Sequence, residues 1–429
     1  MLRSHMPPTH RPQSSSVAAF LRRAARPAKG AALALLLGAA LATGSTGCRS
    51  TDAPRQDPGS QLLEPNTFMS AWSQRIDTGD YGAPDQVFLR DDLVLIYTDR
   101  NAVVALSATG GTTQWISTDV VGPLDRLWPP VLLEALNRLG TAVERFIAFP
   151  SNTSYILLTA DGGDRLQETP LERGNRALTS PTFGYEGLAF AGLADNYGGR
   201  AAQIDPTREV NPILTPTLVR GVVIGRPVVF DDIFYVADET GAVTAITQDG
   251  RRAWPIERFE TGRAVTAHLT ADEGGLYVPS NDSVFYVLDR ETGRVLWRHF
   301  AEVPLFRPAF PTQDFVYLPV EGRGVVALSK TEGATIGREP TWVAEGARDV
   351  LSHDDRNVYL LYRDGHIVAH DKRTGEEKFR TERNDFTMFA RNRDGARIIA
   401  ATTSGEIVAI DPVLTRGQVG RMVMLDTAE

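Results

Sequence analysis

Cysteine is almost missing from this sequence of 429 residues, which contains only Cys48. A lone cysteine cannot form a disulfide within its own chain, so no disulfide framework supports the fold. Long hydrophobic runs are also scarce. The main apolar run, Gly30 to Leu41, is far shorter than the roughly 20 residues that a helix needs to span a bilayer. With 42% hydrophobic residues, the chain still has enough apolar material for a large core.

Common catalytic motifs are missing as well. The sequence contains no HExxH, no GxSxG, no Gly-Lys-Ser/Thr phosphate loop and no GxGxxG dinucleotide motif. His366 and His370 lie four positions apart on one predicted strand and therefore on one face, where two imidazoles could ligate a metal. A third ligand is not evident, and we expect His370 to be a buried histidine bonded to backbone. We predict no cofactor, metal or catalytic residue.

The N-terminal region has the features of a targeting segment. A basic stretch precedes the apolar run, and small residues then lead to Cys48. This arrangement resembles a bacterial lipobox, which implies lipidation at Cys48. Ser45 stands where the lipobox usually has an aliphatic residue, so ordinary cleavage nearby is the alternative. The predicted organisation is a signal peptide over 1–47, a proline-containing tether over 48–66 and one domain over 67–429.

Charge excludes one class of partner. The chain has 45 Lys and Arg and 53 Asp and Glu, and residues 1–47 contain six of the basic residues and none of the acidic ones. Removing that segment leaves a net charge of −14. An acidic surface repels phosphate backbones, so we expect no nucleic-acid binding.

A pattern recurs at nearly equal intervals along the last two thirds of the chain. Its anchor positions are Ala245, Val287, Ala327, Ala369 and Ala409. A four-stranded antiparallel blade needs about 40 residues, which matches this interval, so the period predicts an all-β propeller of such blades. Acidic pairs recur before the apolar strands, and we interpret them as turn residues.

The sequence leaves the number of blades open. Ala105 starts another copy of the pattern, and the gap from it to Ala245 is more than three repeat intervals long. This gap fits two degenerate blades with insertions, whose anchors lie near residues 155 and 203. The prediction is therefore eight blades, or seven if one of the weak blades is not real.

Closure of the ring has its own signal. Trp72 precedes Ala105 by the same interval that separates Trp254 from the next anchor, Val287. This spacing predicts that an N-terminal strand around Trp72 completes a blade whose other strands come from the C-terminus. Joining both chain ends in one sheet removes an exposed edge. Residues Val419 to Leu425 compete for that position.

One segment, Leu124 to Gly140, departs from the strand pattern. Pro129 and Pro130 precede the apolar run Val131 to Leu139, and Gly140 follows it. Prolines before and a glycine after such a run predict a short helix. We expect this helix to cover an edge of the propeller, and an exposed apolar face there would mark a partner site.

The skeleton Ala-x-Asp-x-x-Thr-Gly-x-x-x-Trp is clearest over Val287 to Trp297 and returns over Ala369 to Phe379. It resembles the PQQ-like propeller repeat of quinoprotein dehydrogenases and of BamB-like outer-membrane assembly lipoproteins. The resemblance covers roughly residues 67–415. It implies that the aromatic residue of each repeat stacks on a turn of the neighbouring blade. The predicted docking residues are Trp72, Trp115, Trp254, Trp297 and Phe379. The role of Trp342, which follows its anchor by a longer interval than the others, is left open.

The function implied by the resemblance is a non-enzymatic scaffold, lipid-anchored to the outer membrane and facing the periplasm. Its expected partners are other envelope proteins, with outer-membrane assembly components among the candidates. The alternative is a PQQ-dependent or other small-molecule enzyme. Quinoprotein dehydrogenases are much longer and cover their quinone with a disulfide between adjacent cysteines, which Cys48 alone cannot supply. No convincing Asp, Glu and Asn set for the calcium of such enzymes is visible either.

Overall fold

The computed structural model describes residues 65–413, except 119, 123–124, 137–142, 172–175, 178, 180–181, 184–188, 196–197, 205–212, 218, 220 and 383. Cys48, the predicted signal peptide and most of the predicted tether lie outside the described residues, as do residues Val419 to Leu425. The only helix within the described part is the single turn α2 (Thr78–Tyr81), which Asp77 caps with its side chain. None of the described helices is long and apolar enough to cross a membrane.

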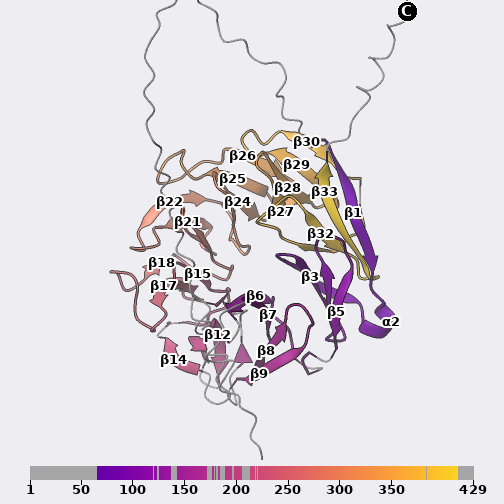
Figure 1. The fold of residues 1–429 in the computed structure, drawn as a ribbon. Helices are drawn as coiled ribbons and strands as arrows, with labels where there is room; N and C mark the ends of the chain where they lie inside the picture. Colours follow the sequence, from indigo (N-terminus) through magenta and orange to yellow (C-terminus); the bar gives the residue numbers. More distant parts are fainter. Residues whose placement is uncertain are drawn as a thin grey trace, which may run out of the picture.

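The described strands form eight antiparallel sheets arranged in a ring (Figure 1). Six of them are regular four-stranded blades made of consecutive strands. The first two are β2 (Pro84–Arg90) to β5 (Thr113–Ser117), with β3 (Leu93–Thr98) and β4 (Val103–Ser107), and β6 (Val131–Leu136) to β9 (Arg165–Pro170), with β7 (Val143–Pro150) and β8 (Ser154–Thr159).

The other four regular blades follow in chain order. They comprise β15 (Val228–Phe230), β16 (Ile233–Ala237), β17 (Ala242–Thr247) and β18 (Phe259–Glu260); β19 (Thr270–Asp272), β20 (Gly275–Pro279), β21 (Val284–Leu288) and β22 (Val295–Phe300); β23 (Phe310–Pro311), β24 (Phe315–Val320), β25 (Gly324–Ser329) and β26 (Trp342–Glu345); and β27 (Ala347–His353), β28 (Asn357–Tyr362), β29 (Ile367–Asp371) and β30 (Glu377–Arg380).

Two sheets differ from this plan. One lies in the region of weak repeats and has five strands, with two short ones both pairing with β12. Its members are β10 (Arg176–Ala177), β11 (Thr182–Phe183), β12 (Ala189–Asp195), β13 (Gly198–Ile204) and β14 (Ile213–Thr217). The other combines the two ends of the domain in the order β1 (Thr67–Arg75), β33 (Glu406–Val413), β32 (Ile398–Ala401) and β31 (Met388–Ala390). Seven of the eight sheets thus have four strands, and the predicted all-β propeller of four-stranded antiparallel blades is confirmed.

The β1–β33 pairing joins the N-terminal and C-terminal strands. The two strands are antiparallel, and Trp72 lies opposite Ala409. Figure 1 shows β1, in indigo, beside β33, in yellow. The N-terminal strand predicted from the Trp72 spacing therefore occupies the outer position of this sheet.

Hydrophobic cores lie between the blades. The described residues form eight buried clusters, and each cluster joins two neighbouring sheets. One cluster packs Val94 and Ile96 of β3 against Ile399 and Ile407 of the β1–β33 sheet, so the ring is packed all the way round. Burial of these side chains is the main contribution to the stability of the ring. The connecting loops join consecutive blades along the chain but add little packing of their own.

The recurrent small anchor and the closing aromatic lie opposite each other on adjacent strands. The registered pairs are Ala105 with Trp115, Val287 with Trp297, Ala327 with Trp342, Ala369 with Phe379 and Ala409 with Trp72. The anchors are fully buried. A small residue there leaves room for the large ring beside it, which explains why the sequence pattern repeats both.

The helix predicted over Leu124 to Gly140 is wrong. Val131–Leu136 form strand β6, which pairs along its whole length with β7. Pro130 accepts a hydrogen bond from Arg90 of the neighbouring blade. The run has helix-forming residues, but an inner strand is needed to complete this blade, and pairing with β7 outweighs the local propensity. No edge-covering helix exists over the described part of this segment.

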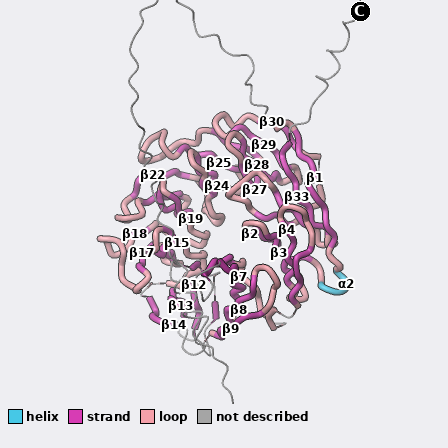
Figure 2. Tube along the Cα trace, in the orientation of Figure 1, coloured by secondary structure: helices cyan, strands magenta, loops and turns pink. Residues whose placement is uncertain are grey.

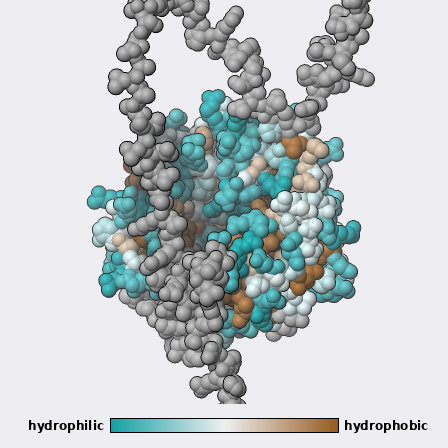
Figure 3. Space-filling model, viewed as in Figure 1, coloured by the Kyte–Doolittle hydropathy of each residue, from teal (hydrophilic) through white to brown (hydrophobic). Residues whose placement is uncertain are grey.

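The first strand of each blade lies closest to the ring centre. In Figure 2 the strands β2, β15, β19 and β27 surround the centre, whereas α2 lies on the outside. The described surface in Figure 3 is mainly hydrophilic with small, separate hydrophobic patches. The loops and strand ends at the centre therefore meet from several blades, although they are far apart in the sequence.

Candidate functional site

Indole groups dock each blade onto the next. In four cases the indole Nε1–H donates a hydrogen bond to a backbone carbonyl in a turn of the neighbouring blade. The pairs are Trp72 with Ala108 (3.0 Å), Trp115 with Ala160 (2.7 Å), Trp254 with Arg290 (2.7 Å) and Trp342 with Lys372 (2.8 Å). Trp342 thus docks like the others, although its spacing from Ala327 left its role open.

A glycine lies under each of these four rings. Gly293 has a φ of +72°, and a Cβ there would come within 2.6 Å of the Trp254 ring. Gly111, Gly163 and Gly375 stand in the same relation to Trp72, Trp115 and Trp342. The glycine of the repeat therefore has two functions. It adopts a positive φ, and its missing Cβ lets the indole ring lie directly on the backbone.

Trp297 docks in a different way. The Arg338 guanidinium lies over its ring, 4.3 Å from the ring centroid, and donates to the Ser329 carbonyl (2.6 Å). Arg338 belongs to the segment between β25 and β26, which runs beside β22. There the Arg338 backbone N–H donates to the Arg298 carbonyl (2.9 Å). The extra residues that separate Trp342 from its anchor are therefore an insertion that covers the preceding blade.

Phe379 contacts the closing strand. Its ring centroid lies 4.9 Å from that of Phe68 on β1 and 6.5 Å from that of Tyr359 on β28. Both neighbours belong to the core cluster between the β27–β30 blade and the β1–β33 sheet. All five sequence-predicted aromatic positions thus lie at boundaries between blades, whereas Cys48 falls outside the described residues.

The two candidate metal-binding histidines make backbone contacts. His370 is buried, and its Nδ1–H donates to the Gly375 carbonyl (2.9 Å), which leaves Nε2 to accept from the Tyr362 hydroxyl (2.9 Å). His366 Nδ1 lies 2.8 Å from the Thr381 carbonyl. No group of three or more His, Cys, Asp or Glu side chains suited to a metal occurs among the described residues. Each ring is thus held by its own blade.

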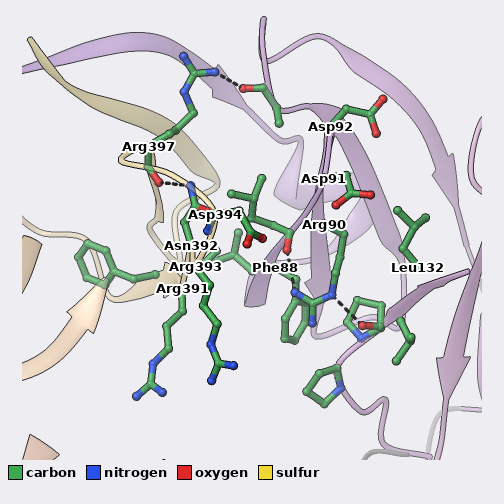
Figure 4. Close-up of a pocket in the computed structure, with 18 of the residues that line it drawn as sticks. Phe88, Arg90, Asp91, Asp92, Leu132, Arg391, Asn392, Arg393, Asp394 and Arg397 are labelled. Carbon is green, nitrogen blue, oxygen red and sulfur yellow. Dashed lines mark hydrogen bonds between the residues drawn. The ribbon is translucent and has the colours of Figure 1, made fainter. Parts of the chain in front are cut away.

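A cavity of about 1490 Å³ lies at the centre of the ring. Its walls come from the inner strands β2, β6, β15, β19 and β31 and from the loops beside them (Figure 4). Five arginines from three separate parts of the chain line it: Arg90, Arg226, Arg391, Arg393 and Arg397. In Figure 4, Arg391 and Arg393 extend side by side, away from the carboxylates of Asp91 and Asp92.

Only two of the five arginines form ion pairs with described carboxylates. Arg397 binds Asp411 (2.6 Å) and Arg391 binds Asp349 (2.6 Å). Arg90 donates instead to the carbonyls of Pro130 (2.9 Å) and Leu89 (2.7 Å). Five carboxylates also line the cavity, so its charges balance in number, but three of its arginines have no ion pair with a described residue.

Arg226 and Arg393 have even fewer partners. The buried Nε of Arg226 has no hydrogen-bond partner among the residues that the structure describes. The Arg393 side chain has no ion pair with a described residue and lies 5.8 Å from the Phe310 ring centroid. Burial, reinforced by the positive charges of Arg90 and Arg393, lowers the pKa of Arg226 to about 10. Both guanidinium groups stay charged near neutral pH.

Exposed apolar side chains mark a second surface. Phe300 on β22 is 47% exposed and Ile336 in the adjoining insertion is 62% exposed. Backbone pairing between Arg298 and Ile336 holds the insertion against β22, and the Arg298 guanidinium lies over the Phe300 ring. We call Phe300 and Ile336 the β22 apolar surface.

The family model described as outer membrane protein assembly factor BamB matches residues 198–350 and 304–419, which together cover just over half of the chain. The chain belongs to this BamB family. The match includes the regular blades from β15 onward, where the repeat is clearest. The resemblance to PQQ-like repeats is thereby confirmed. Among curated proteins, no sequence matches this BamB-family chain.

Solved structures show the same fold. The crystal structure of BamB from Moraxella catarrhalis is 16% identical, with a TM-score of 0.57, and the match covers 80% of this chain and 98% of that one. The computationally designed Ika8 protein is 13% identical (TM-score 0.54; 81% and 99% covered). A quinohemoprotein alcohol dehydrogenase, ADHIIG from Pseudomonas putida HK5, is 14% identical (TM-score 0.56; 83% and 78% covered). At these identities the likeness shows the fold alone.

The cavity arginines were not predicted from the sequence. Arg90 ends a strand, Arg226 precedes one, and Arg391 and Arg393 stand in a hairpin, so no short motif contains them. A signal was available in the alignment of repeats. Arg90, for instance, directly precedes the Asp91-Asp92 turn that the repeats share, and this places it at the inner end of its blade.

Proposed function

We propose that this BamB-family propeller is a non-enzymatic scaffold that binds other envelope proteins, with outer-membrane assembly components as its partners. The observation that carries the proposal is the family match over residues 198–419. The fold supports it, because indole docking and shared cores hold the blades in a fixed ring that can present several surfaces at once. The β22 apolar surface offers such a contact area at a blade edge.

Site-specific photo-crosslinking in the native envelope tests this proposal. A crosslinking residue placed at Phe300 or Ile336 should capture an outer-membrane assembly component, identified by mass spectrometry. Leu166 on β9, which is 42% exposed, is the matched apolar control on another blade. Capture of assembly components at none of the three positions, combined with none in a co-purification from solubilised envelope, would contradict the scaffold role.

We further propose that Cys48 is the lipidated first residue of the mature protein, anchored to the outer membrane and facing the periplasm. A cysteine that follows a short apolar run and a stretch of small residues is the supporting observation. Replacing Cys48 with Ala should move the protein from the membrane fraction to the soluble fraction. Unchanged membrane association of Cys48→Ala would reject the anchor and leave the scaffold role open.

The enzyme alternative has a direct test. The likeness to an alcohol dehydrogenase at 14% identity concerns the fold only. We therefore expect that adding PQQ and calcium to the purified protein produces neither a bound-quinone absorbance band nor dye reduction with alcohols or sugars. Dye reduction above the level of a heat-denatured sample would replace the scaffold proposal by a quinoprotein function.

A further inference from the structure

The central cavity brings together arginines that have no ion pair with a described residue. Arg90 at the end of β2, Arg226 just before β15 and Arg393 after β31 come from three different blades, yet all three line the same space. None of them forms an ion pair with a described residue. Arg90 and Arg226 are half-buried and Arg393 is exposed, so all three guanidinium groups are open to a ligand in the cavity.

The arginines also act on one another. Burial lowers the pKa of both Arg226 and Arg393. The charges of Arg90 and Arg393 add to this effect at Arg226, and the charge of Arg391 adds to it at Arg393, where Asp394 and Asp272 offset part of it. A bound anion would reduce this repulsion between the arginines. Among the described residues, Arg226 Nε has no hydrogen-bond partner and the Arg393 guanidinium lies over the Phe310 ring, so both groups have N–H donors to offer a ligand.

His268 adds a neutral donor to the same wall. Its Nδ1 accepts a hydrogen bond from the Arg226 backbone N–H (2.8 Å), which places the proton of the neutral ring on Nε2. Burial and the nearby Arg226 and Arg391 lower the pKa of His268 to about 4, so the ring is neutral at pH 7. The neighbouring residues Arg226 and His268 thus provide a charged guanidinium donor and an uncharged imidazole N–H donor.

Five carboxylates line the cavity too, and two of them form ion pairs with arginines. Asp92 binds Arg145 (2.5 Å) and Asp411 binds Arg397 (2.6 Å). Asp91, Asp394 and Glu134 also line the cavity. Asp91 lies in the β2–β3 turn, and Figure 4 shows it apart from Arg391 and Arg393. Asp394 adjoins Arg393 in sequence and offsets part of its charge. The positive region is therefore the part bounded by Arg226, Arg391 and Arg393.

We propose that this part of the central cavity binds a small oxyanion with two or more carboxylate or phosphate oxygens, held between Arg226 with His268 on one wall and Arg393 with Arg391 on the other. Guanidinium groups suit this ligand class, because their planar N–H donors match the paired oxygens of carboxylates and phosphates. The cavity of about 1490 Å³ is larger than such an anion, so ordered water completes its solvation. The inference concerns a different surface from the scaffold proposal and does not depend on it.

Calorimetric titration of the purified mature protein with citrate and with inorganic phosphate tests this proposal. Chloride at matched ionic strength serves as the reference for screening. We expect saturable binding of at least one of the two anions, and the preferred one tells whether the ligand is a carboxylate or a phosphate. Arg226→Gln and Arg393→Gln should each weaken binding by about tenfold or more, the size expected for loss of a hydrogen bond between charged groups.

Two variants make the result specific. Arg393→Lys keeps the charge but loses the paired donors, so it should bind more weakly than wild type and more strongly than Arg393→Gln. Arg294→Gln removes an exposed arginine outside the cavity and should leave affinity within about twofold, as expected for a surface position. Thermal unfolding of Arg226→Gln checks the fold, and removal of an unpaired charge should leave the melting temperature equal or higher. Absence of saturable binding of both anions, or equal affinity in Arg226→Gln, Arg393→Gln and wild type, would overturn the proposal.

Discussion

The glycines beneath the docking indoles combine two requirements at one position. Gly293 has positive φ, and its missing Cβ makes room for the Trp254 ring. Gly250 also has positive φ, at +79°, but a Cβ there would meet nothing within 4 Å. An added Cβ at Gly250 would therefore cost only backbone strain, whereas an added Cβ at Gly293 would also clash with the Trp254 ring.

Gly250→Ala should destabilise the protein by about 1–2 kcal/mol, the cost of a left-handed conformation for a residue with a Cβ. Gly293→Ala should cost about 1–3 kcal/mol more, because the ring must also shift. Urea unfolding followed by tryptophan fluorescence measures both. Equal losses in the two variants would mean that Trp254 moves freely and that close docking contributes little.

Buried histidines predict how stability depends on pH. Burial lowers the pKa of His370, and its neutral form is fixed by the Gly375 carbonyl and the Tyr362 hydroxyl. A pKa that is lower in the folded than in the unfolded state gives stability that is fully present above about pH 6.5 and is lost as the pH falls through the folded value.

We therefore expect the melting temperature of the wild type to fall more steeply than that of His370→Gln as the pH is lowered from about 6.5, the ordinary histidine pKa, to about 4.5. The carboxylates that also titrate in this range are the same in both proteins, so their contribution cancels in the comparison. Calorimetry at half-unit pH steps gives the two curves. Parallel curves would show that His370 protonates without disturbing its blade.

At the scale of single elements, the segment between β25 and β26 shows how an insertion can be used. It places Arg338 over Trp297, and Arg338 also accepts a hydrogen bond from His299 through its carbonyl (2.6 Å). Arg338 is only 6% exposed. The insertion thus replaces the glycine contact made by the other docking indoles and adds a backbone pairing to the outer strand of the preceding blade.

Arg338→Ala should cost about 2–4 kcal/mol, because it removes a buried cation–π contact and the hydrogen bond to the Ser329 carbonyl. Arg294→Ala is the control, since it is exposed on the same blade as Trp297 and should change stability by no more than about 0.5 kcal/mol. Chemical unfolding measures both. A loss below about 1 kcal/mol in Arg338→Ala, less than a single net hydrogen bond, would mean that Trp297 is held by its own blade.

Much of this element structure could be predicted from the repeat, because a buried anchor opposite an aromatic residue imposes the same register in each blade. Ala105 with Trp115 and Val287 with Trp297 follow the rule directly. Strand β6 could not be predicted, because Val131–Leu136 has helix-forming residues and its strand conformation depends on pairing with β7. The cavity site was harder to predict than the strands, because its arginines come together only when separate blades close into a ring.

At the scale of the whole molecule, the stability of the ring depends on the sheet that joins its ends. Deleting residues 67–75 removes β1, with its pairing to β33, and the half-buried Trp72 indole. Truncation of a fully buried tryptophan costs about 3–5 kcal/mol, an upper bound for this indole, out of a typical total of about 5–15 kcal/mol. We expect a large drop in melting temperature. Deleting residues 50–62 instead, within the predicted tether, should leave the melting temperature nearly unchanged.

Thermal unfolding of both deletions measures the difference. The deletion of residues 67–75 removes Trp72 together with β1, so the change in melting temperature measures the contribution of the whole strand. Equal melting temperatures in the two deletions would show that β1 adds little to the ring and that the remaining three strands of the sheet close it adequately.

The pairing of Trp72 with Ala409 also has a consequence in time. The first strand of the domain leaves the ribosome long before the strand that it pairs with, because nearly the whole domain lies between the two along the chain. Contacts this distant in sequence form slowly, because a long loop must close before they are made. Until then β1 is an open edge. The ring can therefore close by this pairing only after β33 has been synthesised.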